Sequence, residues 1–93
     1  MIAGGWTPYS APVTKEAQEV FDKAVTLIGV TYTPIAFATQ VVAGMNYSFF
    51  CNAKASTQPA YNEAAMVSVY VDLDGNARLV GIQMLDHMKR IEH

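Results

Sequence analysis

The segment Gln40-Val41-Val42-Ala43-Gly44 predicts the tip of a β-hairpin. Its two valines are β-branched and favour extended backbone, whereas the Ala-Gly pair after them permits a tight reversal of the chain. Sequence rich in β-forming residues flanks the segment on both sides, at 35–39 and 46–51. The two valines are therefore expected at an exposed tip. A cluster of exposed apolar residues commonly marks a surface that a partner covers.

Composition limits the class of protein. With 93 residues, of which 52% are hydrophobic, the chain predicts one globular domain over 1–93 rather than a disordered segment. A net charge of -2 provides no basic surface for nucleic acid, and no apolar run is long enough to span a membrane. The one cysteine, Cys51, cannot form an intramolecular disulfide. No signal peptide is visible, so the expected location is cytoplasmic if the chain is complete and secreted if it is a processed form.

One amphipathic helix is predicted after Thr14. This threonine is a good N-cap, and Glu16 places a negative charge in the first turn. Apolar residues then recur at helical spacing, which predicts one continuous stripe over about four turns. Gly29 is expected to end the helix in a left-handed conformation. The stripe consists of Ala17, Val20, Phe21, Ala24, Val25 and Ile28.

The remaining sequence alternates in hydrophobicity, as half-buried strands do. Strands are predicted at 31–39, 45–53, 65–73 and 77–85, and Asp74-Gly75 predicts a hairpin turn between the last two. Pro8 and Pro12 limit any fifth strand to an edge of the sheet. The expected fold is α+β, with an antiparallel, twisted sheet of four to five strands wrapped around one α-helix. In the first strand the alternation is centred on Ile35 and Phe37. In each of the other strands three residues are expected to share one face: Tyr47, Phe49 and Cys51 in the second, Val67, Val69 and Val71 in the third, and Val80, Ile82 and Met84 in the fourth.

Taken in order, these features resemble the cystatins, most closely the small, disulfide-free stefin type that reversibly inhibits papain-like cysteine proteases. The resemblance rests on the glycine arm at Gly4-Gly5, a helix that begins after Pro12-Val13-Thr14, the pentapeptide at 40–44 followed by Asn46-Tyr47, and the hairpin around Leu73. It implies a cystatin-like fold and a non-enzymatic protease inhibitor without a cofactor or metal. The expected partners are papain-like cysteine proteases of the cathepsin type, with neither nucleic acid nor membrane.

In cystatins an N-terminal arm and two hairpins form one wedge that enters the protease cleft beside its catalytic residues. By this resemblance, a glycine lets the arm bend along the non-primed subsites, and the second hairpin covers the primed side. The expected state is a monomer, whose opened hairpin can exchange the arm and helix with a second copy to give a domain-swapped dimer. The resemblance assigns protease binding to Ile2, Ala3, Gly4 and Gly5, to Gln40, Val41, Val42, Ala43 and Gly44, and to Leu73, Asp74 and Gly75.

The sequence also leaves alternatives open. Leu73-Asp74 stands where stefins usually carry Leu-Pro, which leaves open whether the second hairpin contributes to binding. The main alternative is a non-inhibitory cystatin-fold module for protein interaction, and another is a small α+β enzyme. Little in the sequence favours the enzyme, because strand alternation turns Cys51 toward the core, where a thiol is usually inert. His87 and His93 lack a third ligand at metal spacing.

Overall fold

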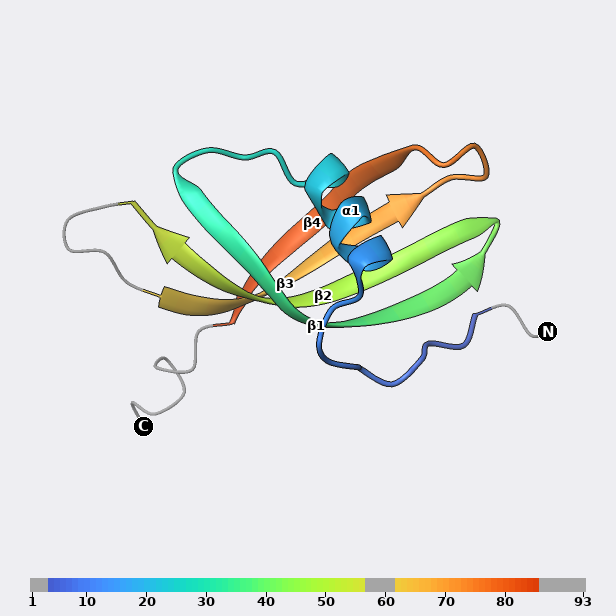
Figure 1. Cartoon of the computed structure of the whole chain (residues 1–93), viewed down its shortest axis with the longest axis horizontal. Coiled ribbons are helices and arrows are strands. Elements are labelled where there is room, and N and C mark those ends of the chain that lie inside the picture. The colour runs from blue at the N-terminus through green and yellow to red at the C-terminus, as the bar shows by residue number, and fades with distance from the viewer. Residues whose placement is uncertain (1–3, 57–61, 86–93) are drawn as a thin grey trace.

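The computed structural model describes residues 4–56 and 62–85. Within them lie one helix, α1 (Lys15–Ala24), and four strands, β1 (Val30–Val42), β2 (Gly44–Ala55), β3 (Asn62–Val71) and β4 (Ala77–Leu85). The strands form one sheet in the order β1-β2-β3-β4, and each pairs antiparallel with the next. Helix α1 lies across one face of this sheet (Figure 1). The predicted α+β arrangement of an antiparallel sheet and one helix is therefore confirmed.

Helix α1 begins as predicted but ends early. The Thr14 hydroxyl oxygen accepts a hydrogen bond from the backbone N–H of Ala17 at 3.1 Å, as an N-cap should. The helix is only 10 residues long, because the β-branched Val25 already has extended backbone. Ile28 is 96% exposed, so its predicted place in the buried stripe was wrong. Gly29 has a positive φ of 93°, but it lies beyond the helix and does not cap it.

The core lies between α1 and the inward face of the sheet. Phe49 in β2 is fully buried and packs edge-on against Phe21 of α1, with ring centroids 5.0 Å apart. Such an aromatic pair adds about 1 kcal/mol to the gain from burial alone. Phe37 and Tyr47 stack on the Phe49 ring at centroid distances of 6.4 and 5.6 Å. The predicted inward faces of β2 and β3 are confirmed, with Cys51, Val67 and Val69 buried and Tyr47 and Val71 packed against them.

A β-bulge changes the predicted alternation in β1. The register shifts between Pro34 and Ala36, so Ile35 has no partner on β2. Its side chain is 47% exposed, although the sequence pattern aligned it with Phe37. Because a bulge inserts one unpaired residue, the alternation is reset beyond it.

A second bulge lies in β4. Val69 pairs with Leu79 and Ser68 with Gly81, which leaves Val80 unpaired and 61% exposed. Leu79 packs against the core in its place, and Ile82 also lies on the inward side. The prediction that Val80 shares the inward face of Ile82 was therefore wrong.

The N-terminal stretch runs along the free edge of β1. The Thr7 N–H donates to the Thr39 carbonyl at 2.8 Å, and Ser10 exchanges two backbone hydrogen bonds with Phe37, at 2.9 and 3.0 Å. Pro8, which has no N–H to donate, lies between these two contacts. The stretch thus occupies the edge position expected for a segment that contains proline.

Candidate functional site

Three segments that are distant in sequence lie at one end of the molecule. They are the described start of the arm at Gly4-Gly5, the β1–β2 tip at 40–44 and the β3–β4 turn at 72–76. Figure 1 shows the described start of the arm and both turns at the same end of the sheet. We call these three segments the loop end. The predicted site residues therefore come together, apart from Ile2 and Ala3, which lie outside the described residues.

The β1–β2 tip is held in one shape by the neighbouring strand. Val42 and Gly44 are partners in the ladder, so Ala43 alone connects the two strands. The Tyr70 hydroxyl of β3 donates a hydrogen bond to the Ala43 carbonyl. Gly44 has a φ of 110°, and a Cβ at this position would collide with the Val71 carbonyl oxygen and lie 2.9 Å from the Tyr70 hydroxyl. Only glycine fits this close approach to β3.

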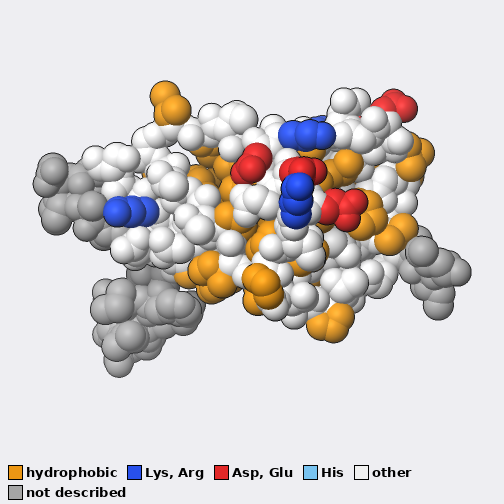
Figure 2. All heavy atoms as spheres, in the orientation of Figure 1, with side chains coloured by type: hydrophobic (Ala, Val, Ile, Leu, Met, Phe, Trp, Pro, Cys, Tyr) orange, Lys and Arg blue, Asp and Glu red, His pale blue; other side chains and the backbone are white. Residues whose placement is uncertain are grey.

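The loop end presents hydrophobic surface to solvent. Val41 is 37% exposed, Val42 is half-buried, and Leu73 in the second turn is 81% exposed. The expectation that both valines reach water thus holds for about a third of the Val41 side chain and for less of Val42. Figure 2 shows hydrophobic atoms at this end, whereas most charged side chains visible on the same face gather over α1. Exposed apolar residues on fixed turns form a surface that a partner can bury.

The β3–β4 turn is organised by the carboxylate of Asp72. One of its oxygens accepts hydrogen bonds from the backbone N–H groups of Asp74 and Asn76, both at 2.9 Å. The bond from the Asn76 N–H is the main cause that lowers the pKa of Asp72, since it favours the charged form. Gly75 supplies the positive φ, 89°, that the turn requires. The role of Asp72 was not predicted from the sequence, although an aspartate followed by a turn glycine is a recognisable signal.

The arm and the β1–β2 tip are joined through Gln40. The Gln40 side-chain Nε2 donates to the Gly4 carbonyl at 2.9 Å, and its Oε1 accepts from Asn46 Nδ2 at 2.8 Å. Trp6 lies opposite Gln40 in an isolated antiparallel bridge and is 49% exposed. Gln40 was predicted, from the resemblance, to contact a protease; its contact within the chain was not predicted. Trp6 lies along the sheet edge.

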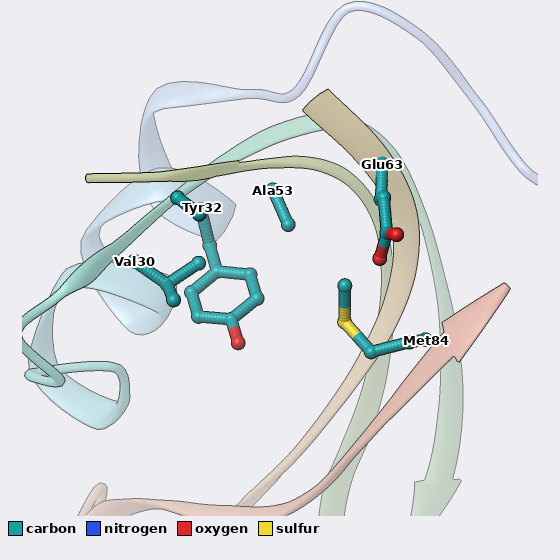
Figure 3. A pocket seen from close by; sticks show the side chains of 6 residues that line it. Val30, Tyr32, Ala53, Glu63 and Met84 are labelled. Atoms are coloured by element: carbon teal, nitrogen blue, oxygen red, sulfur yellow. The ribbon is translucent and has the colours of Figure 1, made fainter. Parts of the chain in front are cut away.

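A cavity of about 270 Å³ lies on the inward face at the opposite ends of the strands. In Figure 3, Tyr32 faces Glu63 and Met84 across it. Among the residues that the structure describes, the cavity offers one carboxylate and one phenolic hydroxyl, and no described histidine, cysteine, serine or lysine lines it. These groups do not form a nucleophile–base pair. The lining residues are Val30, Tyr32, Ala53, Ala55, Glu63 and Met84.

Cys51 points into the core, as the sequence predicted, and is fully buried. Burial raises the pKa of its thiol to about 12, so the thiol stays protonated near neutral pH and is a poor nucleophile.

Among residues 4–56 and 62–85, no group of three His, Cys, Asp or Glu side chains could hold a metal ion. His87 and His93 lie outside the described residues. No helix in the same two ranges is long and apolar enough to cross a membrane.

No family model, curated protein or solved structure matches the chain. The geometry of the loop end and the resemblance carried by the pentapeptide at 40–44 are therefore the two features that bear on function.

Proposed function

We propose that this protein is a cystatin-type inhibitor of papain-like cysteine proteases, which binds reversibly and tightly and carries no catalytic chemistry of its own. The loop end occludes the active-site cleft. The observation that supports this best is the convergence of Gly4-Gly5, the tip at 40–44 and the turn at 72–76 at one end of the sheet. Three adjacent segments can cover a cleft more fully than one hairpin can.

The rigidity of the loop end supports tight binding. The Tyr70 hydroxyl and the close approach of Gly44 to β3 fix the first tip, and Asp72 fixes the second turn. Because both turns are already ordered, association loses little conformational entropy. Protease–inhibitor interfaces of this kind typically bury about 1,600 Å² in total.

The tip is also poorly suited to being cleaved. Hydrolysis requires that the carbonyl of the scissile bond enter the oxyanion hole of the protease. Ala43 is the one residue of the tip outside the ladder, and its carbonyl already accepts the Tyr70 hydroxyl. The Ala43 carbonyl is therefore held by β3 and would have to give up this hydrogen bond to enter the oxyanion hole.

The second turn contributes Leu73, which is 81% exposed. The Asp72 carboxylate is engaged within the turn, so Asp74 is the carboxylate that a protease meets there. An apolar side chain beside one exposed charge makes this turn the weaker of the two hairpin contacts, since desolvating an unpaired carboxylate costs free energy.

Titration of papain with the protein tests the proposal. We expect stoichiometric loss of peptidase activity, recovery of activity on dilution, and an intact inhibitor by mass spectrometry. Trypsin, a serine protease, serves as the control and should keep its full activity. Absence of papain inhibition at micromolar concentration, or cleavage within 40–44, would refute the proposal.

Gly5→Arg should weaken inhibition about tenfold or more, which corresponds to about 1.4 kcal/mol. A Cβ at Gly5 meets no atom within 4 Å in the free protein, so the fold should accommodate the substitution. The loss should arise because the arginine stiffens the arm and clashes with the protease at closest approach. Gly81→Arg is the matched control, because Gly81 in β4 is equally open and lies away from the loop end. Inhibition constants and melting temperatures are measured for both variants. An unchanged inhibition constant for Gly5→Arg would show that the arm does not contribute to protease binding.

One observation favours the alternative of a non-inhibitory cystatin-fold interaction module. An apolar hollow of about 230 Å³ lies between the N-terminal stretch and the outer face of the sheet. It is lined by Tyr9, Ala36, Phe50 and Met66. The papain titration separates the two functions, since a module that binds through this hollow leaves the protease active.

A further inference from the structure

We infer that Gln40 is a positioning residue whose side-chain amide fastens the N-terminal arm to the first hairpin before any protease is bound. The effect of this contact on inhibition rests on the proposed function. The contact itself belongs to the free protein and can be tested without a protease.

The hydrogen bonds fix the orientation of the Gln40 amide. The Gly4 carbonyl can only accept, so the Gln40 group that lies 2.9 Å from it must be the NH₂ donor. The Gln40 Oε1 then faces Asn46, whose Nδ2 donates to it at 2.8 Å. Asn46 therefore orients the Gln40 amide, and Gln40 in turn holds the arm.

Gly4 makes two hydrogen bonds to described residues of the hairpin, and this side-chain contact is the shorter of them. The backbone N–H of Gly4 donates to the Val41 carbonyl at 3.4 Å, well beyond the usual length of about 2.9–3.0 Å for such a bond. The next arm residue bonded to β1 through its own backbone N–H is Thr7, at 2.8 Å. Loss of the Gln40 donor should therefore release Gly4 and Gly5 while the stretch from Thr7 onward stays in place.

An arm that is already ordered in the free protein should increase affinity for the protease, because ordering a loose segment on binding costs conformational entropy. One neutral hydrogen bond of this kind shifts the docking equilibrium of the arm by roughly fivefold. Gln40 thus contributes to binding through the arm, in addition to any contact of its own with the protease.

Gln40→Glu tests the contact in the free protein. The substitution keeps an acceptor for Asn46 but places an oxygen, not a donor, against the Gly4 carbonyl. We expect the ¹H–¹⁵N heteronuclear NOE values of the Gly4 and Gly5 amides to fall, while those of Thr7 and Ser10 stay at the wild-type level. Gln83→Glu, an identical change at an exposed position of β4, should leave all four values unchanged. Unchanged values at Gly4 and Gly5 in Gln40→Glu would overturn the inference.

A double-mutant cycle tests its consequence. Gln40→Glu should weaken papain inhibition roughly fivefold in the wild-type background. In the Gly5→Arg background, where the arm is already impaired, Gln40→Glu should weaken papain inhibition by less than about twofold. An equal loss in both backgrounds would overturn the inference, because Gln40 would then act by touching the protease directly. If the wild-type protein does not inhibit papain, the proposed function fails while the NOE measurement still decides the role of Gln40.

Discussion

Val42→Asp should weaken papain inhibition by about a hundredfold or more, or about 3 kcal/mol. The reason is that binding would bury an unpaired carboxylate at the centre of the contact, where no water can solvate it. Stability should change little by comparison, within about 1 kcal/mol, because Val42 lies at the end of β1 and is only half-buried in the free protein. Inhibition constants and denaturant midpoints, measured on the same preparations, separate the two effects.

The matched control for this prediction is Ile35→Asp. Ile35 occupies the β1 bulge, is 47% exposed and lies in the middle of β1, away from the loop end, so it receives the same charge without approaching the protease. It should inhibit like the wild-type protein. If Val42→Asp also inhibits like the wild type, the tip has no part in the mechanism.

The fold was predictable where local signals decide it. The Thr14 cap and the alternation of β2 place their elements correctly, because each depends on neighbouring residues. The two bulges escaped prediction for a physical reason. A bulge leaves regular alternation on both sides and shifts only its phase, so the pattern around Ile35 or Val80 looks like an ordinary strand. The end of α1 was not predicted because the apolar residues keep their helical spacing beyond Val25, where the backbone is already extended.

The loop end was predictable in part for a similar reason. The tip at 40–44 has a turn signal within a few residues, and so has Gly75. The contacts that fix these turns are not local. Tyr70 and Ala43 are 27 positions apart in sequence, and Gln40 and Gly4 are 36 positions apart. Periodicity and turn patterns cover only a few residues, so they predict neither contact. Such pairs become visible only when the register of the sheet is known.

Gly44→Ala should be the most destabilising single change at the loop end, costing about 3 kcal/mol of the free energy of unfolding. Two separate effects add here. The φ of 110° is strained for any residue with a Cβ, and that Cβ would also collide with the Val71 carbonyl oxygen of β3. Urea denaturation with the linear extrapolation measures the loss.

Gly75→Ala separates the two effects. Gly75 has a comparable φ of 89°, but a Cβ there meets nothing within 4 Å, so this variant carries the backbone strain without the collision. It should lose only about 1 kcal/mol. Folded Gly44→Ala should also inhibit papain less well, since relief of the collision moves the tip away from Tyr70 and β3. Equal destabilisation by the two variants would instead mean that the tip adjusts freely, and that β3 does not set its shape.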